Sequence, residues 1–385
     1  MMIDSHFKEH CWTGLFAGLI LLIASGFCGA EEVGAIPPSM NEKVVMLRVG
    51  EGFRSVQLET TLFIPPGQGP HPLVVINHGK ALGDPRFDPR ARFVAASREF
   101  LKRGYLVALP MRAGFSKSTG SDISPLCNSE SYGSLQGEIV RNILGELIKR
   151  PDVDPTKILV IGQSTGGLTA IASGTVPFPG VRGVINFAGG VKNSSCGWER
   201  ALVDAFSSYG KSFKYPSLWF YGDNDSFWGA ELPKIMHEKF TAAGGKAQLV
   251  SYGKFAEGDA HGMFSNERGV AIWWPETEKF LIGLGLPVAI QYCIEKTLPP
   301  SGTNFAAISD VQAVPILDDR RREAYKRFLT RPSPRAFAIG PDGNVGGSWK
   351  VFDPIADALT ACERIAKQPC TLYAVDDTVV WPKNK

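Results

Sequence analysis

The stretch KILVIGQSTGGLTA, Lys157 to Ala170, decides the fold of this chain. Its first part, Lys157 to Ile161, is a short apolar run of the kind found in strands that are covered on both faces. GQSTG follows at Gly162 to Gly166 as a turn, and the small residues after it open a helix. A strand, a glycine turn and a helix in direct succession predict one unit of a mainly parallel sheet.

Ser164 stands at the centre of this turn. In a nucleophile elbow, a GxSxG turn between strand and helix, the flanking glycines permit a strained backbone that lifts the serine hydroxyl clear of the sheet. Gly162 and Gly166 occupy those flanking positions. The same letters also fit an ordinary turn whose serine caps the helix, so other parts of the chain must discriminate between the two interpretations.

A nucleophilic serine needs a base, and few histidines are available. Beyond the N-terminal segment the chain holds His71, His78, His237 and His261. The first two precede the serine, and the third falls inside a predicted helix. His261 lies in a glycine-rich loop after the last predicted strand of the sheet, which makes it the candidate base.

The acid that orients this base is expected just beyond the strand SLWFY, in the loop GDND. Asp225 ends that loop, at the carboxyl edge of the sheet where open α/β sheets place their sites. Asp223 and Asp259 remain as alternatives. The resulting order, Ser164, Asp225 and His261, is the serine, aspartate, histidine order of the α/β-hydrolase fold.

An oxyanion would need backbone N–H donors. The strand LVVIN ends in His78-Gly79-Lys80, which resembles the HG turn that supplies one donor in this fold. The amide of Lys80 is therefore expected to serve, with its side chain facing solvent, and the amide of Thr165 is expected to be the second donor. His78 is interpreted as a structural histidine of the turn rather than a base.

Apolar runs alternate with helical patterns from Lys43 to about Pro287, which predicts the α/β class with a mostly parallel sheet flanked by helices. The expected strands are 44–49, 57–64, 73–77, 105–109, 158–161, 183–187, 217–221 and 247–252, the first two as an antiparallel entry pair. The expected helices are 91–103, 135–150, 167–173, 198–209, 231–243 and 276–283.

The pattern changes beyond Pro287, where Leu298 to Gly302 is typical of a linker. A small C-terminal α+β domain is expected after it, with strands at 306–313, 335–339 and 372–380 and helices at 318–329 and 355–366. The predicted domains are a catalytic domain at 31–297 and this C-terminal domain at 303–385. Binding to the cell envelope, packing against the catalytic domain and dimerisation remain open as its role.

Residues 1–30 are predicted to be an export signal. An apolar run from Thr13 to Phe27 ends in small residues, and cleavage is expected near Ala30; the alternative is an uncleaved N-terminal membrane anchor. No later stretch reaches the roughly 18 apolar residues of a membrane span. The mature chain is therefore expected to be periplasmic or secreted.

The cysteines after this segment are expected to form disulfides in an oxidising compartment. Cys362 and Cys370 lie at the end of a predicted helix and the start of a predicted strand, and they are one candidate pair. Cys127 with Cys196 is a second, which leaves Cys293 over, although the sequence does not establish the connectivity. No CxxC and no Cys/His cluster at zinc spacing occurs, so neither a metal nor a cofactor is expected.

As an ordered set, these motifs resemble the α/β-hydrolase superfamily, close to the dienelactone hydrolases and the bacterial acyl-esterase or prolyl-peptidase-like enzymes. The set comprises His78-Gly79, the run Arg103-Gly104-Tyr105 before a strand that ends at Pro110, the segment RAGFSKS at Arg112 to Ser118, GQSTG, the GDND loop and the DAHG loop around His261. The resemblance implies an α/β-hydrolase fold over residues 43–287 and hydrolysis through an acyl-enzyme. Dienelactone hydrolases proper tend to use a cysteine where Ser164 stands, which argues against that particular activity.

A carboxylic ester with a small or medium acyl or aryl group is the expected substrate. The segment between the strands that end at Phe187 and begin at Ser217 is too short for a bulky lipase lid. Phe227, Trp228 and Phe264 are candidates for the pocket wall, with ordinary packing under the loops as the alternative. Two other functions stay open: a serine peptidase that acts on short peptides, and a binding protein without catalysis.

Composition excludes several other classes of protein. Of 385 residues, 44% are hydrophobic and 21% are charged, which excludes disorder or a coiled coil for the chain as a whole. Lys and Arg number 41 against 38 Asp and Glu, a net charge of +3, and no dense basic tract occurs. A nucleic-acid partner is therefore not expected, and the oligomeric state stays open.

Overall fold

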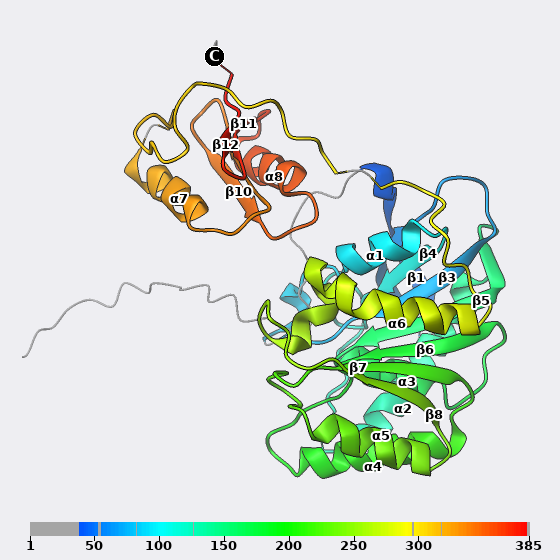
Figure 1. The fold of residues 1–385 in the computed structure, drawn as a ribbon. Coiled ribbons are helices and arrows are strands. Elements are labelled where there is room, and N and C mark those ends of the chain that lie inside the picture. Colours follow the sequence, from blue (N-terminus) through cyan, green and yellow to red (C-terminus); the bar gives the residue numbers. More distant parts are fainter. Residues whose placement is uncertain are drawn as a thin grey trace, which may run out of the picture.

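The structure, a computed structural model, describes residues 38–52, 55–81, 83–125, 127–294, 296–316 and 318–382. These residues form a large sheet of eight strands and a separate sheet of four strands near the C-terminus (Figure 1). The predicted export signal at 1–30, with its cleavage site near Ala30, lies outside the described residues. Within them, no helix is both long and apolar enough to cross a membrane.

The large sheet has the strand order β1-β2-β4-β3-β5-β6-β7-β8. Its strands are β1 (Glu42–Val49), β2 (Val56–Phe63), β3 (His71–Asn77), β4 (Leu106–Pro110), β5 (Val153–Gln163), β6 (Val181–Phe187), β7 (Pro216–Tyr221) and β8 (Lys246–Ser251). β2 pairs antiparallel with β1 and with β4, and all other neighbours are parallel. The predicted mostly parallel sheet, with its antiparallel entry pair, is confirmed.

Helices cover both faces of this sheet (Figure 1). One face carries α1 (Val94–Leu101) and α6 (Val270–Gly283), and the other carries α2 (Ser129–Leu147), α3 (Thr165–Ser173), α4 (Trp198–Ser212) and α5 (Leu232–Ala242). Each helix lies near its predicted place. α6 begins at Val270 and not at the predicted 276, and Pro275 lies inside the helix.

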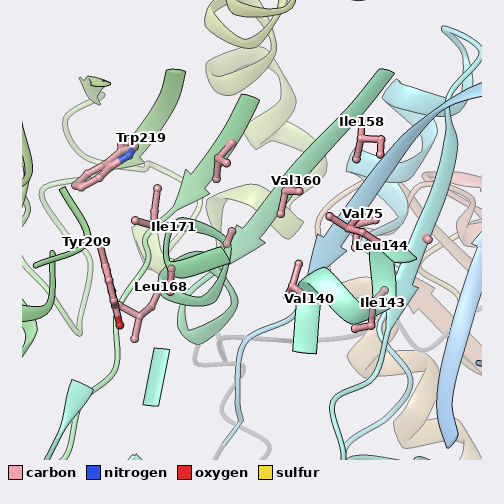
Figure 2. Packing of buried hydrophobic residues seen from close by; sticks show 14 of the residues in the cluster. Val75, Val140, Ile143, Leu144, Ile158, Val160, Leu168, Ile171, Tyr209 and Trp219 are labelled. Carbon is pink, nitrogen blue, oxygen red and sulfur yellow. The ribbon is translucent and has the colours of Figure 1, made fainter. Parts of the chain in front are cut away.

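Each central strand contributes to two hydrophobic cores, one on each face. Along β5, Ile158 and Val160 belong to the core beneath α2 and α3, whereas Leu159 and Ile161 belong to the core beneath α1 and α6. Side chains of a strand alternate between its faces, so a strand buried on both sides needs an unbroken apolar run. Each buried aliphatic side chain contributes about 1.5–3 kcal/mol. Figure 2 shows the first of these cores, in which Val75, Ile158 and Val160 approach Val140, Ile143, Leu144, Leu168 and Ile171.

The C-terminal domain combines an antiparallel sheet of order β10-β9-β11-β12 with two helices. Its elements are α7 (Asp319–Leu329), β9 (Arg335–Ile339), β10 (Val345–Trp349), α8 (Pro354–Ala366), β11 (Thr371–Val375) and β12 (Thr378–Val379). The predicted α+β class and both predicted helices are confirmed. The exact domain boundaries, 297 and 303, stay a prediction.

Two strands predicted in this domain are wrong. Residues 306–313 form no strand; the carbonyl of Ile308 accepts a hydrogen bond from the hydroxyl of Tyr325 at 2.7 Å, so the segment lies as a loop against α7. The single strand predicted at 372–380 is a hairpin, because Asp376 has a φ of 50° and turns the chain between β11 and β12. After Gly, Asp and Asn are among the residues that adopt this left-handed backbone conformation most readily.

β10 was not predicted at all, because its sequence VGGSW lacks the apolar alternation of a strand. Tertiary packing explains its glycines. A Cβ on Gly346 would lie 2.3 Å from the carbonyl oxygen of Ala358, so α8 approaches the strand more closely than any side chain allows. Glycine is therefore needed where α8 packs on the strand, while β10 pairs along its length with β9.

The structure contains the disulfides Cys127–Cys196 and Cys362–Cys370, and Cys293 is a free, exposed cysteine. Both predicted pairings are confirmed. Cys127–Cys196 connects the loop before α2 with the loop before α4, and these loops follow β4 and β6 at the carboxyl edge of the parallel strands. Disulfides are typical of proteins outside the cytoplasm.

Candidate active site

Ser164 occupies a strained turn between β5 and α3. Its backbone has φ 56° and ψ −124°, a left-handed conformation that few side-chain-bearing residues adopt. The flanking glycines make the turn possible, because a Cβ on Gly162 would lie 1.9 Å from the carbonyl oxygen of Gly166, and one on Gly166 would lie 2.0 Å from that of Asn77. The geometry is that of a nucleophile elbow, at a serine that is 6% exposed.

Asp225 and His261 meet at the carboxyl edge of the sheet. Nδ1 of His261 lies 2.9 and 3.0 Å from the two carboxylate oxygens of Asp225, and neither side chain is exposed. The carboxylate also accepts hydrogen bonds from the backbone N–H groups of Phe227, at 2.8 Å, and Trp228, at 3.2 Å. These amides hold the carboxylate in place, and the carboxylate in turn orients the imidazole ring.

A side chain next to the serine connects the elbow with residues 257–269, the segment that carries His261 and is called the histidine loop below. Nε2 of Gln163 donates a hydrogen bond of 2.6 Å to the backbone carbonyl of His261. His261 belongs to a short 3₁₀ helix, η4 (Ala260–Ser265), so this bond attaches η4 to the end of β5. The nucleophile candidate and the base candidate, 97 positions apart along the chain, are thereby held at one place.

The two alternative acids lie elsewhere. Asp223 is exposed on the loop after β7. Asp259 caps η4, because one of its oxygens accepts from the N–H of His261 at 2.9 Å, and it also accepts from the backbone and the hydroxyl of Ser226. Asp259 therefore joins the acid loop to the histidine loop, whereas Asp225 is the carboxylate that contacts the imidazole.

His78 is held in the turn that follows β3. Its Nε2 accepts from the backbone N–H of Arg112 at 3.0 Å, and its Nδ1 lies 2.6 Å from the carbonyl oxygen of Gly79. Burial, reinforced by the charge of Arg112, lowers the pKa of His78 to about 3, so the ring is neutral at pH 7. A neutral ring whose Nε2 accepts carries its proton on Nδ1 and donates it to Gly79. These contacts agree with a structural role for His78.

The guanidinium of Arg112 forms a hydrogen bond with the same turn. Its Nη2 donates to the carbonyl oxygen of Gly79 at 2.8 Å. The carbonyl of Gly79 and the N–H of Lys80 belong to one planar trans peptide and point in opposite directions. A hydrogen bond to this carbonyl therefore also fixes the direction of the Lys80 N–H. Thr165, the first residue of α3, has an N–H without an acceptor inside its helix. These are the two amides expected to bind an oxyanion.

The side chain of Lys80 was expected to face solvent, and it does so only in part. Its ammonium group forms an ion pair with Asp122, and the two side chains are 35% and 14% exposed. The ammonium also lies 5.9 Å from the ring centroid of Phe115. The segment after β4, which carries Asp122 and Phe115, is thereby joined to the turn after β3.

Of the three aromatic candidates, two flank the imidazole. The ring of Phe227 lies 4.4 Å from the ring of His261, and that of Trp228 lies 5.8 Å from it. Trp228 is further held by a 2.7 Å hydrogen bond from its Nε1 to the carbonyl of Ala188. Phe264 is only 1% exposed and stacks on Phe187 at 3.9 Å, so its ring packs in the core beneath the site.

Sequence reasoning missed Gln163, Arg112 and Asp122 as parts of the site. The first two stand inside quoted motifs, GQSTG and RAGFSKS, but nothing in a linear pattern shows which distant carbonyl a side chain will reach. Asp122 carries no motif at all. Among the residues that the structure describes, no group of three or more His, Cys, Asp or Glu side chains has the arrangement of a metal site.

A family model described as the dienelactone hydrolase family matches residues 58–278, more than half of the chain. No curated protein matches the chain in sequence.

Solved structures with a similar fold include esterases and peptidases. The native Est2 esterase of Thermogutta terrifontis is 18% identical with a TM-score of 0.46, and the alignment covers 69% of this chain and 99% of that one. Dipeptidyl peptidase 4 of Porphyromonas gingivalis is 14% identical with a TM-score of 0.48, over 63% of this chain and 35% of that one. The acylaminoacyl peptidase of Pyrococcus horikoshii is 15% identical with a TM-score of 0.47, over 66% and 43%.

Proposed function

The chain belongs to the dienelactone hydrolase family, and from this membership and the geometry of its site we propose that it is a serine hydrolase of carboxylic esters. One observation carries the proposal. A serine on a strained elbow stands at the same edge of the sheet as a histidine whose Nδ1 lies 2.9 Å from a buried aspartate. This combination of nucleophile, base and orienting acid is the one used for acyl transfer.

In the first half of the reaction, Nε2 of His261 removes the hydroxyl proton of Ser164 as the oxygen attacks the ester carbonyl carbon. Asp225 keeps the proton of His261 on Nδ1 and stabilises the imidazolium that forms. The amides of Lys80 and Thr165 bind the oxyanion of the tetrahedral intermediate. Collapse of the intermediate expels the alcohol, which takes its proton from His261, and leaves an acyl-enzyme.

In the second half, His261 removes a proton from water, which attacks the acyl carbon of the Ser164 ester. A second tetrahedral intermediate forms at the same amides. Its collapse returns the proton from His261 to the serine oxygen and releases the carboxylic acid. The cycle consumes one water per ester, and no step needs a redox partner.

The surroundings favour small or medium acyl or aryl groups. Phe227 and Trp228, beside the imidazole ring, form the wall proposed for the acyl pocket. Between β6 and β7 the chain holds one helix, α4, so that segment builds no bulky lid. A wall of two aromatic rings offers an apolar contact of limited size.

The test is hydrolysis of p-nitrophenyl esters from acetate to palmitate by the mature protein, the Ser164→Ala variant and the Ser173→Ala variant. Ser173 is a matched control, because it is equally buried and lies at the far end of α3. We expect Ser164→Ala to lower kcat by roughly 10⁴-fold or more, with turnover highest on short or medium chains, and Ser173→Ala to leave kcat unchanged.

Peptidyl anilides run in parallel discriminate the alternatives. Cleavage of alanyl or prolyl anilides without ester turnover would favour a serine peptidase. An absence of turnover on both substrate classes would favour a binding protein. Equal activity in Ser164→Ala and wild type would refute the assignment of the nucleophile.

We further propose that the protein is exported, with cleavage near Ala30. Two disulfides in the chain support an oxidising compartment. N-terminal sequencing of the exported protein should begin near Glu31, whereas a retained Met1 would indicate the membrane-anchored alternative.

A further inference from the structure

Phe352 of the C-terminal domain is buried against the catalytic domain. It lies in the loop between β10 and α8, is 5% exposed, and belongs to the same hydrophobic cluster as the side chains of α1 and α6. Two cations contact its ring: Cζ of Arg98 lies 4.0 Å from the centroid, and Nζ of Lys296 lies 5.0 Å from it. A cation over an aromatic ring is a favourable contact when it is shielded from water.

Asp353 fixes the position of this ring. One carboxylate oxygen caps α8 by accepting from the N–H of Ala356 at 3.0 Å. The other accepts from the N–H and the hydroxyl of Thr297, at 2.8 and 2.7 Å. Thr297 belongs to the segment that leads out of the catalytic domain, so Asp353, which is 3% exposed, joins α8 to that segment immediately beside Phe352.

Arg98 extends the contact from Phe352 to the histidine loop. This residue of α1 is 4% exposed, and its Nη1 and Nη2 donate to the two carboxylate oxygens of Glu267 at 2.8 and 2.6 Å. Glu267 opens the short helix η5 (Glu267–Gly269), which follows η4 after one residue. The bidentate pair therefore holds the chain just beyond the element that carries His261.

Residues at the start and in the middle of α1 contact the segment around His261. Phe93, at the N-terminus of α1, lies 5.3 Å from the ring of Phe264 in η4, while Arg98 holds Glu267 further along. A small cavity of about 130 Å³ lies between the domains at this place, and residues of both line it: Glu267, Arg268, Lys296, Pro334, Lys350 and Val351. The C-terminal domain thus meets the catalytic domain at the elements behind the histidine loop.

We propose that the C-terminal domain positions the catalytic base, with Phe352 as the positioning residue. Its ring keeps the Arg98 guanidinium covered and directed at Glu267, and the Glu267 pair holds η5 and η4 so that His261 stays aligned with Asp225. This inference rests on the proposed function. Removal of the ring admits water around the guanidinium, which weakens the ion pair by raising the local dielectric.

The experiment uses the full mature chain with Phe352→Ala, Phe352→Leu and the control Trp349→Ala. Trp349 is an aromatic residue of the same domain, 38% exposed, whose cation partner is Arg331 in that domain. Amide hydrogen exchange over residues 257–269 and the separate values of kcat and KM for a p-nitrophenyl ester are the two readouts.

For Phe352→Ala we expect exchange in 257–269 to rise about tenfold and kcat to fall about tenfold, with KM within about twofold of wild type, since a displaced base slows chemistry more than binding. Phe352→Leu, which restores apolar volume without an aromatic face, should lie in between. Trp349→Ala should match wild type in both readouts.

Three results would overturn the inference: exchange and kcat unchanged in Phe352→Ala, exchange raised equally over the whole chain, or equal effects of Phe352→Ala and Trp349→Ala. If Phe352→Ala does not fold, Glu267→Gln replaces it, because an amide cannot accept both guanidinium bonds, and the same local rise in exchange is expected. A wild type without ester turnover would refute the proposed function alone, since hydrogen exchange reports on the histidine loop independently of activity.

Discussion

Replacement of Arg112 by methionine tests whether the turn after β3 depends on a side chain from the segment after β4. Arg112 is 8% exposed and donates to the carbonyl of Gly79 at 2.8 Å and to the hydroxyl of Tyr132 at 3.1 Å. Its guanidinium also lies 4.5 Å from the ring of Phe115. Methionine keeps most of the apolar length of the side chain and removes every one of these donors.

The structure suggests how large the effect should be. Loss of two hydrogen bonds from a charged donor is expected to lower the free energy of unfolding by about 3 kcal/mol. A missing oxyanion donor lowers kcat by about 10²–10³-fold, but Nδ1 of His78 still holds the carbonyl of Gly79 from the other side. We therefore expect a partial loss of about 10–100-fold in kcat, or about 1.4–2.7 kcal/mol of transition-state stabilisation, with little change in KM.

The assay is steady-state hydrolysis of p-nitrophenyl butyrate together with urea unfolding, and Arg103→Met is the matched control. Arg103 is 6% exposed, donates to the carbonyl of Val288 at 2.9 Å and to Glu99, and lies 3.6 Å from the ring of Trp274, at the α1 end of the domain. Both variants should lose comparable stability, and only Arg112→Met should lose kcat. If kcat in Arg112→Met stays within twofold of Arg103→Met, the turn does not depend on the guanidinium and the reasoning is refuted.

Two further predictions concern stability. Because the pKa of buried His78 lies at about 3, below its unfolded value of 6.5, its contribution is complete above pH 6.5 and declines as the pH falls toward 3, at about 1.4 kcal/mol for each pKa unit. The advantage of wild type over His78→Gln in urea unfolding should therefore shrink by a few kcal/mol between pH 7 and pH 4; a constant difference would contradict the neutral buried ring. Replacing both cysteines of Cys127–Cys196, which are 69 positions apart, by serine should cost about 4 kcal/mol in guanidinium unfolding, against about 2.5 kcal/mol for Cys362–Cys370 with its separation of 8. An equal or larger cost for the shorter loop would be inconsistent with loop-closure entropy as the source.

Prediction from the sequence succeeded where a pattern is local and repeated. The run KILVI, the glycines around Ser164 and the small residues after them each specify a conformation of the nearest few residues, and β5, the turn and α3 lie where expected. The same reasoning located the other seven strands of the large sheet. The hydrophobic pattern of a strand shows which of its faces must be buried, and this pattern depends only on the residues of the strand.

Prediction failed where an element depends on a neighbour. The glycine-rich strand β10 has no apolar pattern of its own, pairs with β9 and leaves room for α8 at Gly346. Residues 306–313, in contrast, have an apolar pattern and form no strand. The helix predicted at 276–283 begins earlier, at Val270, and contains Pro275. For β10 and for 306–313, contacts with other elements outweighed the local preference.

For the site, the order of serine, aspartate and histidine along the chain was visible in the sequence, and so were the residues of the two turns. The sequence could not discriminate Asp225 from Asp223 and Asp259, because all three stand on loops at the same edge of the sheet. In the structure, Asp225 is the one of the three whose carboxylate contacts the imidazole of His261. The hydrogen bond from Arg112 to the carbonyl of Gly79 likewise becomes visible only in the tertiary structure.

The sequence by itself therefore determined the strands and helices of the large sheet, the order of Ser164, Asp225 and His261 along the chain, and the residue types at the carboxyl edge of that sheet. Only the tertiary structure decided which side chains meet there, and that Phe352 of the C-terminal domain packs against Arg98 behind the histidine loop. The physical reason is that hydrophobic periodicity and turn propensity act over a few residues. A hydrogen bond or ring contact between distant segments, in contrast, depends on the packed positions of every element between them.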